Sequence, residues 1–387
     1  MKILSVDVGT GTQDIFLYDS RLDLENGFKL IVPSPTMMVY RRLKEATRRG
    51  EAVLLSGVIM GGGPSQWAAE EHVRAGFPVY ATPEAARSFN DDLEAVREMG
   101  VLVISEDEAA CLPGSTRRVE LRDFDFFAIA RAFEGFGVSL GDLNAVAVAV
   151  FDHGNAPPDI SDRQFRFDYL DERIRAKNSL SAFAFPADEV PEIMTRLQAV
   201  VASAGDLDVP LVVMDTAPAA VLGATFDLRV ASAERKLIAN VGNFHTLAFR
   251  LGPGGIEGVF EHHTGLIDLP RLESLLLMLA DGSLRHEDVF GDHGHGALIY
   301  ETEPLPLRGG RSPEGQFGVA VTGPRRNMMR FSSLNPYFAV PFGDMMTAGC
   351  FGMLAAVADV LPEFGEQIRA SLRGTGGSGT PPWELEG

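Results

Sequence analysis

The sequence is poor in cysteine. Its 387 residues include only Cys111 and Cys350, which cannot form a disulfide framework or supply the three clustered thiolates of a radical iron–sulfur enzyme. We interpret both as small buried side chains in a reducing compartment. No signal peptide follows Met1, and no uninterrupted apolar run reaches the roughly 20 residues that span a bilayer. The sequence therefore predicts a cytoplasmic protein without a membrane partner.

Positive charge is also scarce. The chain has 34 Lys and Arg residues against 53 Asp and Glu residues, which gives a formal net charge of −19. Because an acidic surface repels nucleic acid, we expect no nucleic acid partner. A site for phosphate groups must then be built locally, from backbone N–H groups, a metal ion and a few arginines.

One short pattern occurs twice in the chain. Residues 2–19 read KILSVDVGTGTQDIFLYD, and residues 236–250 read KLIANVGNFHTLAFR. Each consists of an apolar strand, a glycine-containing loop and a second apolar strand. Glycines at such a turn expose backbone N–H groups and let a phosphate approach closely. Two such hairpins, about half the chain apart, predict two related lobes that hold a phosphate chain between them.

Two common phosphate-binding loops do not match the first hairpin. The chain has no Gly-Lys pair and therefore no P-loop. A Rossmann fingerprint requires a third glycine at the start of a helix, but Asp14 occupies that position and a strand-like segment follows it. The remaining interpretation is a strand–loop–strand cradle in which Asp7 ends the first strand. A carboxylate at that position can hold Mg²⁺ against phosphate oxygens.

The rest of the chain alternates apolar strands with amphipathic helices, as in an α/β protein. We expect a first lobe over 1–225, which carries an α/β insertion at about 35–115, and a second lobe over 226–372. Residues 155–185 are polar and look irregular. Residues 373–387 have the composition of a linker and are expected to form a flexible tail.

Five segments resemble the superfamily of actin, sugar kinases and heat-shock ATPases. In chain order they are similar to the first phosphate motif, the first connecting helix, the second phosphate motif, the adenosine motif and the second connecting helix: residues 7–14, 215–220, 240–246, 321–325 and 343–356. More narrowly, the chain is similar to a family labelled pyruvate formate-lyase activating enzyme-like.

The resemblance implies two ribonuclease H-like lobes, the actin-like ATPase fold, with ATP and Mg²⁺ in the cleft between them. Asp7 would hold the metal ion. The residues implied to bind the nucleotide are Gly9, Thr10, Gly11, Thr12 and Gln13 from the first hairpin, Asn240, Gly242, Asn243, His245 and Thr246 from the second, and Thr322, Gly323 and Arg325 from the adenosine motif.

Catalysis would depend on carboxylates. The superfamily usually carries an aspartate where this chain has Asn240, so nucleotide binding without hydrolysis is an alternative. Asp152 follows a buried strand in a region where kinases of the superfamily place the base that takes the proton from the attacking hydroxyl. We therefore predict Asp7 and Asp152 as catalytic residues; the alternative for Asp152 is a carboxylate that caps a turn.

Two further features are candidate sites. His262, His263, His293 and His295 lie in two short segments that also contain Asp and Glu, a combination that can bind a transition metal. Ordinary turn or core histidines are the alternative. The glycine loop at 61–65 precedes a helix whose N-terminus would attract an anionic substrate, with a tight β–α turn as the alternative.

These observations predict an ATP- and Mg²⁺-dependent phosphotransferase or ATPase. It would act on a small-molecule substrate or drive the activation of a partner enzyme, with a homodimer as a candidate assembly. The alternatives are a nucleotide- or metabolite-binding regulatory module without catalysis and a metal-dependent enzyme that uses the histidine-rich segments.

Overall fold

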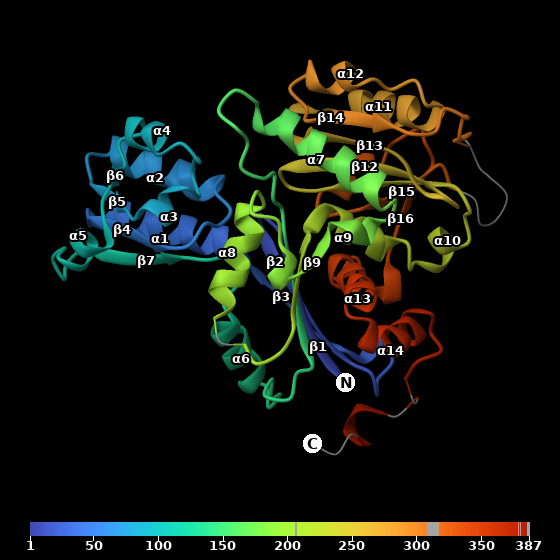
Figure 1. The fold of residues 1–387 in the computed structure, drawn as a ribbon, viewed down its shortest axis with the longest axis horizontal. Coiled ribbons are helices and arrows are strands. Elements are labelled where there is room, and N and C mark those ends of the chain that lie inside the picture. Colours follow the sequence, from blue (N-terminus) through green and yellow to red (C-terminus); the bar gives the residue numbers. More distant parts are fainter. Residues whose placement is uncertain (206, 308–316, 378, 380, 385–387) are drawn as a thin grey trace.

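The computed structural model describes residues 1–205, 207–307, 317–377, 379 and 381–384. Three β-sheets organise this part of the chain. We call them the first sheet, the second sheet and the insertion sheet. Figure 1 shows the two larger sheets together and the insertion sheet to one side of them.

The first sheet has six strands in the order β3-β2-β1-β8-β10-β9. β1 pairs antiparallel with β2 and parallel with β8, and β10 pairs parallel with β8. Its strands are β1 (Lys2–Val8), β2 (Thr12–Asp19), β3 (Phe28–Pro33), β8 (Ala145–Val150), β9 (Ala184–Pro186) and β10 (Leu211–Asp215). β1 and β2 form the first predicted hairpin.

The second sheet has the order β14-β13-β12-β11-β15-β16, in which the five strands from β13 to β16 repeat β3-β2-β1-β8-β10 of the first sheet. The sixth strands, β14 and β9, lie at opposite edges. β11 pairs antiparallel with β12 and parallel with β15, as β1 does with β2 and β8. The strands are β11 (Lys236–Val241), β12 (His245–Gly252), β13 (Gly255–His263), β14 (Gly296–Ile299), β15 (Val319–Thr322) and β16 (Pro336–Phe338). Two sheets with one shared ribonuclease H-like strand order confirm the predicted two-lobed α/β fold.

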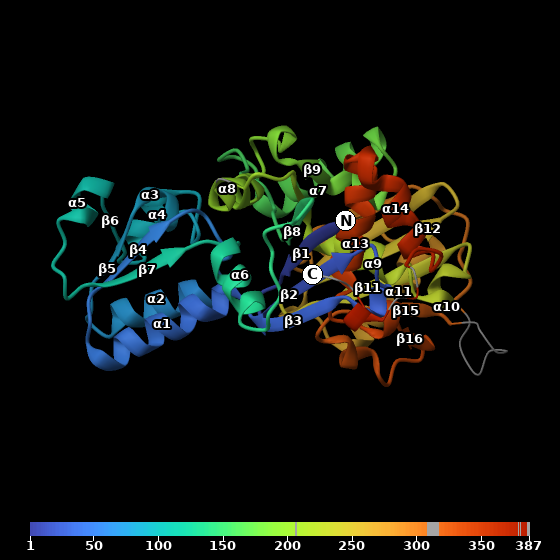
Figure 2. The same cartoon turned by 90° about the horizontal axis from the view of Figure 1, so that it is seen from below.

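The insertion sheet lies between β3 and β8 in the chain. Its order is β6-β5-β4-β7, all parallel, with strands β4 (Val53–Gly57), β5 (Val79–Ala81), β6 (Leu102–Val103) and β7 (Arg117–Leu121). β7 lies beyond the predicted limit of the insertion at 115. Helices cover both faces, as Figure 2 shows: α1 (Pro35–Arg49), α2 (Pro64–Arg74), α3 (Pro83–Ala86), α4 (Leu93–Glu98) and α5 (Glu106–Ala110).

The two faces of the first sheet bury different side chains. In β8 the valines pack with α6 (Phe126–Glu134) and α8 (Thr195–Ala204), while the alanines pack against α13 (Ala348–Val360) and α14 (Pro362–Leu372). Successive residues of a strand point to opposite faces, so the sequence AVAVAV produces this division directly. The small alanines allow α13 to pack closely on the sheet.

The segment after the second sheet therefore returns to the first. α13 and α14 share a core with β1, β2, β8 and β10, although they follow β16 in the chain. The second sheet instead packs on α11 (Leu269–Asp281), with α12 (His286–Phe290) beside β14. The limits of the lobes at 225 and 372 stay predictions.

α9 (Thr216–Ala224) follows β10 directly and crosses α13 at very short distance. A methyl group added at Gly223 would lie 1.7 Å from the carbonyl oxygen of Ala348, and one added at Gly352 would lie 1.9 Å from that of Ala219. Only glycine fits at these two positions, because the backbones of the two helices touch. Because α13 packs on the first sheet and α9 contacts β11, the crossing joins the first sheet to the first strand of the second sheet.

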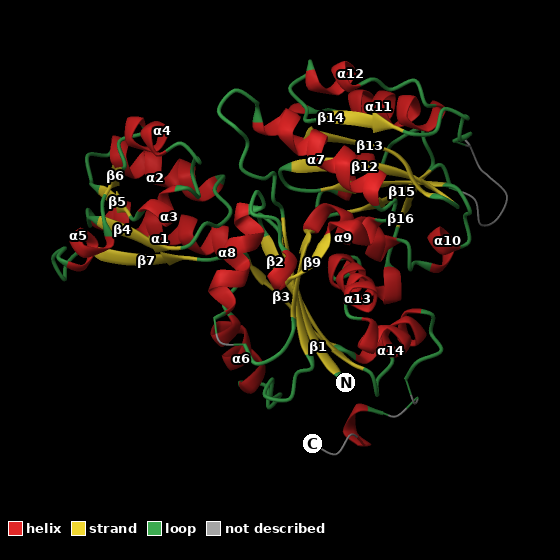
Figure 3. Cartoon of the chain, in the orientation of Figure 1, coloured by secondary structure: helices red, strands yellow, loops and turns green. Residues whose placement is uncertain are grey.

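Two expectations from the sequence were wrong. Cys111 was expected to be buried but is exposed, whereas Cys350 is buried as expected. Residues 155–185 were expected to be irregular, but they contain α7 (Asp162–Ala176), which Figure 3 shows beside the second sheet. Its sequence lacks a clear apolar stripe because one of its buried residues is an arginine, Arg166, that pairs with carboxylates. Arg166 thus occupies a buried position of α7 where an apolar residue would have indicated an amphipathic helix.

The remaining elements are short. They are α10 (Leu228–Ala231) and the 3-10 turns η1 (Leu24–Asn26), η2 (Leu180–Phe183), η3 (Ala187–Glu189), η4 (Thr264–Leu266), η5 (Arg326–Met329), η6 (Pro341–Gly343) and η7 (Pro382–Glu384). Part of the predicted tail, residues 378, 380 and 385–387, lies outside the described residues. In the portion that is described, no helix combines the length and apolarity needed to cross a membrane.

Candidate functional site

A cavity lies between the loops of the two hairpins. Of the residues predicted to bind a nucleotide, those that line it are Gly9, Thr10, Gly11, Thr12, Asn240, Gly242, Asn243, His245, Thr322 and Gly323. Asp7 lines it as well, together with Thr216 and Ala217 at the start of α9 and Gly349 at the start of α13. All five segments that resemble the ATPase superfamily therefore meet at one cavity, which we call the interlobe cavity.

Three of the predicted residues do not line the interlobe cavity. Gln13 donates its side-chain amide to the carbonyl of Pro33, and Thr246 shares a buried hydrogen bond of 2.8 Å with the hydroxyl of Thr264. The backbone N–H of Arg325 donates to the carbonyl of Val241 in β11 at 2.9 Å. Gln13 and Thr246 directly follow cavity residues in strands, so the alternation of side chains turns them to the other face.

The two hairpin loops have matching backbone geometry. The N–H of Gly9 donates to the carbonyl of Thr12, and the N–H of Gly242 donates to the carbonyl of His245, both at 2.9 Å. A methyl group at position 242 would lie 2.6 Å from the His245 carbonyl oxygen, so glycine is required there. Each loop is a tight four-residue turn that faces the other across the cavity.

Two buried carboxylates, Asp7 and Asp14, stand opposite each other on β1 and β2 and line the interlobe cavity. The hydroxyl of Thr216 donates to Asp7 Oδ1 at 2.6 Å. Burial raises the pKa of Asp7 to about 6, and burial together with the charge of Asp7 raises the pKa of Asp14 to about 8. Asp14 is the last residue of the first phosphate motif but was not predicted as a site residue.

Asn240 and Gly323 meet at the second side of the cavity. Gly323 has a φ of 94°, and a methyl group on it would lie 2.4 Å from Asn240 Oδ1. Within the described part of the chain, Asn240 Oδ1 is buried and has no hydrogen-bond partner. A neutral amide thus lines the cavity at the position where the resemblance implied a carboxylate.

Asp152 does not line the interlobe cavity. Its Oδ1 accepts the N–H of Gly154 at 2.8 Å, and its Oδ2 accepts the N–H groups of Arg196 and Leu197 at 3.0 and 2.9 Å. The carboxylate is therefore occupied by three backbone donors, two of which lie at the start of α8. This geometry is that of the alternative considered for Asp152, a carboxylate that caps backbone N–H groups.

The insertion supplies a third wall of the cavity. Residues 61–63 line it together with Arg196, which sequence reasoning did not identify. Arg196 is held by an ion pair with the buried Asp123, with 2.6 Å between Nε and Oδ2. Trp67 of α2 stacks on Phe244 at the tip of the second hairpin, with 5.6 Å between ring centroids. The insertion thus touches the second lobe beside the cavity.

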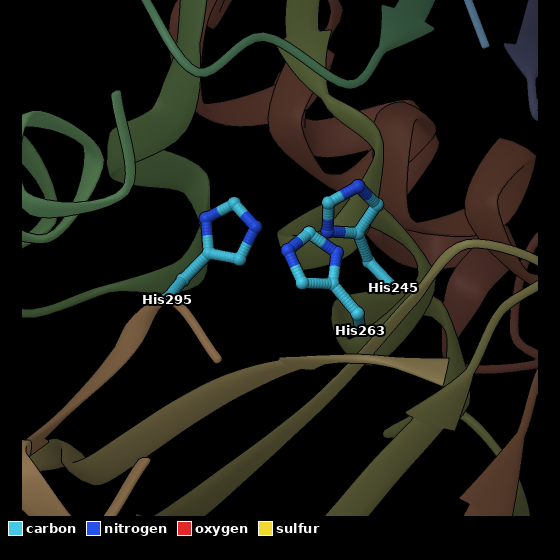
Figure 4. A group of neighbouring side chains, drawn as sticks. All are labelled: His245, His263 and His295. Atoms are coloured by element: carbon cyan, nitrogen blue, oxygen red, sulfur yellow. The ribbon is translucent and has the colours of Figure 1, made fainter. Parts of the chain in front are cut away.

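Three histidines converge at the edge of the cavity: His245, His263 and His295. Figure 4 shows their imidazole rings facing one another. Burial lowers the pKa of His263 to about 4 and that of His295 to about 3, so both rings are neutral at pH 7. Of the four histidines predicted as a second metal site, two belong to this group.

The other two predicted histidines lie elsewhere. His262 points to the opposite face of β13 from His263, and its Nε2 lies 3.6 Å from Asp292. His293 is exposed and has a φ of 62° in the loop before β14. His245, which the resemblance assigned to phosphate binding, takes their place because β12 and β13 pair His245 directly with His263.

A model of the family described as "Putative pyruvate format-lyase activating enzyme (DUF1786)" matches residues 60–328, which is more than half of the chain. The matched region includes the second hairpin and all three histidines of the group. The first hairpin precedes it. No curated protein sequence matches the chain.

Three solved structures are similar at low identity. The activator of the 2-hydroxyisocaproyl-CoA dehydratase from Clostridium difficile with bound ADPNP is 11% identical, covers 96% of this chain and 97% of its own, and has a TM-score of 0.33. The ethanolamine utilization protein EutJ from Carboxydothermus hydrogenoformans is 14% identical, with coverages of 91% and 89% and a TM-score of 0.31.

The third is the ROK hexokinase from Thermus thermophilus, with 13% identity and a TM-score of 0.23. The match covers 66% of this chain but 48% of the hexokinase, so the chain spans about half of that protein's length. The repeated strand order carries the fold assignment, the two-lobed fold of the actin, sugar-kinase and heat-shock ATPase superfamily.

Proposed function

The chain belongs to the DUF1786 family, and we propose that it binds ATP with Mg²⁺ in the interlobe cavity and transfers or hydrolyses the terminal phosphoryl group. The observation that carries this proposal is the pairing of the two hairpin loops across the cavity. Each loop is closed by the same hydrogen bond, and both loops line the cavity. Backbone N–H groups of glycine loops on two sides of a cavity would suit the phosphate chain of a nucleotide.

The residues present fit Mg²⁺. The cavity contains two carboxylates, Asp7 and Asp14, and oxygen donors of this kind are the ligands that Mg²⁺ prefers. In the described structure Asp14 Oδ1 is buried without a hydrogen-bond partner. Burying an unpaired carboxylate oxygen costs free energy of folding, unless a cation binds to it or the carboxyl group is protonated. Asp7 would hold the ion and Asp14 would support it. The bound ion would neutralise phosphate charge.

Other residues of the chain would position the nucleotide and the acceptor. The loops around Gly9 and Gly242 would hold the phosphates, and Gly323 would let the nucleoside lie close to the backbone of β15. The acceptor would enter along residues 61–63 and Arg196, where a guanidinium and a helix N-terminus favour an anionic group. A small molecule or a side chain of a partner enzyme fits this description. Closure of the lobes would exclude water.

The proposal is tested by titration calorimetry of Mg·ATP. We expect binding that weakens at least about tenfold when Mg²⁺ is omitted or when Asp7 is changed to Asn, since about 1.4 kcal/mol corresponds to a factor of ten. Asp142→Asn is the matched control, because Asp142 is an exposed acid paired with Lys2 at the surface. Equal affinity for Mg·ATP in the wild type and Asp7→Asn would overturn the assignment of the metal ligand. The absence of any nucleotide binding would overturn the function.

Asn240 favours a second candidate, a nucleotide-binding regulatory module without turnover. An amide cannot supply charge to a metal ion or act as an effective base, and it occupies the cavity wall where a carboxylate is usual. The two candidates differ in one result. Both bind Mg·ATP, but only the first releases phosphate or labels an acceptor during prolonged incubation with γ-labelled ATP. An Asn240→Asp variant would gain turnover under the second candidate.

A further inference from the structure

We propose that His245, His263 and His295 form a binding site for one divalent transition metal ion, with Zn²⁺ as the best-suited ion, at the edge of the interlobe cavity. This site is separate from the Mg²⁺ ligands Asp7 and Asp14. It stands on different residues, and it does not depend on nucleotide binding.

The fold builds the site through strand register. His245 begins β12 and His263 ends β13, and the two residues are a direct cross-strand pair. Side chains of directly paired residues share one face of the sheet. β14 pairs with β13, and the N–H of His295 donates to the carbonyl of Glu261 at 2.9 Å. Three separate segments thus bring one imidazole each to the same corner of the second sheet.

The donor atoms are close enough to share an ion. One ring nitrogen from each histidine lies within 4.8 Å of the other two. Nitrogen ligands at about 2.0–2.1 Å from Zn²⁺ in tetrahedral geometry are about 3.3 Å apart. The nitrogen atoms would therefore have to approach one another by at most about 1.5 Å on binding, a distance within the reach of small side-chain rotations. Neutral imidazoles suit Zn²⁺, Fe²⁺, Ni²⁺ or Cu²⁺ and not Mg²⁺.

The surroundings supply a carboxylate behind the histidines. Glu261 is fully buried, and its Oε1 lies 2.8 Å from Nδ1 of His245 and 3.7 Å from Nδ1 of His295. Metal-binding histidines commonly have such a carboxylate next to them, because it orients the ring and compensates the charge of the ion. The second oxygen of Glu261 is fixed by Arg166 Nε at 2.6 Å, and Arg166 also binds Asp215 at 2.8 Å.

The histidines lack other partners. Among the described residues, both ring nitrogens of His295 are buried without a hydrogen bond, whereas Nδ1 of His245 faces Glu261 Oε1 at 2.8 Å. Buried polar atoms are normally satisfied, and each orphan costs free energy. Phe151 stacks on His245 with 4.2 Å between ring centroids and restricts the ring. A metal ion would satisfy one ring nitrogen of each histidine, and Glu261 would face the Nδ1 atoms of His245 and His295 from behind.

A metal ion here would face the place where the substrates meet. His245 lines the interlobe cavity, and the site has three protein ligands and therefore an open coordination position. The class of ligand that fits this position is a water molecule or an anionic oxygen of the substrate. The site would then bind or polarise the acceptor and not the nucleotide.

The test is metal binding to protein without an affinity tag. Wild type, His263→Ala and His293→Asn are each incubated with a small excess of ZnCl₂, desalted and measured by elemental analysis. His293→Asn is the matched control, because it removes an exposed imidazole two residues from His295 and asparagine tolerates the positive φ. We expect about one ion per chain in the wild type and control, and less than about a tenth of an ion per chain in His263→Ala, which lacks one of the three ligands.

Two results would overturn the site. One is a wild type that retains less than about a tenth of an ion per chain. The other is a His263→Ala variant that binds as the wild type does. If His263→Ala does not fold, the spectrum of wild-type protein with Co²⁺ decides the matter: intense visible bands of a low-coordinate nitrogen site support the proposal, and the weak spectrum of hydrated Co²⁺ refutes it. Neither measurement involves ATP, so failure here is distinct from failure of nucleotide binding.

Discussion

The crossing of α9 and α13 leads to the sharpest stability prediction. In Gly352→Ala the added methyl group would lie 1.9 Å from the carbonyl oxygen of Ala219 and 2.8 Å from the N–H nitrogen of Gly223. A carbon and a carbonyl oxygen normally stay about 3.3–3.6 Å apart, so the helices would have to separate by about 1.5 Å. Because α13 also packs on the alanine face of β8, this movement would loosen the core of the first sheet.

The expected cost follows from two opposing effects. Overpacking a core typically costs about 1–3 kcal/mol, and the backbone contact here belongs at the upper end of that range. Replacing glycine by alanine inside a helix gains about 1 kcal/mol in helix propensity. We therefore expect a net loss of about 2 kcal/mol, equivalent to about 4–8 °C in Tm for a domain of 150–250 residues.

Differential scanning calorimetry of wild type, Gly352→Ala and Gly135→Ala measures this effect. Gly135 ends α6 in an ordinary helical conformation, and its added methyl group would meet nothing closer than 3.4 Å. We expect the control to unfold within about 0.5 kcal/mol of the wild type. Gly352→Ala with the same Tm as Gly135→Ala would refute the reasoning, because it would mean that the two helices are free to separate.

Three further predictions test individual side chains. In Gly349→Ala the new methyl group would lie 1.9 Å from Asp7 Oδ2, so Mg·ATP affinity measured by calorimetry should fall at least about tenfold; unchanged affinity would argue against Asp7 as the Mg²⁺ ligand. Asp123→Asn leaves the partly buried guanidinium of Arg196 without its ion pair, so thermal unfolding should show a loss of about 2 kcal/mol, and a loss below about 0.5 kcal/mol would contradict this. Burial lowers the pKa of His72. Because the unfolded chain then binds a proton more readily, stability should be highest above about pH 6.5 and should fall as the pH is lowered further. A His72→Gln variant with the same Tm-versus-pH curve as the wild type would disprove that assignment.

The parts of the fold that sequence reasoning predicted are those with local signals. The two hairpins were predicted because glycines interrupt apolar strands at both places, and both hairpins occur as expected. The two-lobed fold followed from finding five segments in the right order. The insertion was visible because strands and helices alternate through it. All of these signals lie within a few consecutive residues.

The parts that were missed depend on contacts between distant segments. α7 looked irregular because Arg166 faces inward, and the carboxylates that neutralise it lie on other elements of the chain. The group of three histidines depends on the register of β12 and β13, which pairs His245 with His263. The alternation of side chains along β13 would have separated His262 from His263, had that strand been predicted.

The stacking of Trp67 on Phe244 has a consequence for how the molecule can be observed. Trp67 is one of two tryptophans in the chain, and the other, Trp383, is highly exposed near the end of the described residues. Phe244 adjoins Asn243, which lines the interlobe cavity. A displacement of the second hairpin loop would therefore change the surroundings of the Trp67 indole ring. The protein carries an intrinsic fluorescent reporter at the junction of the insertion and the second lobe, and a Trp383→Phe variant would isolate its signal.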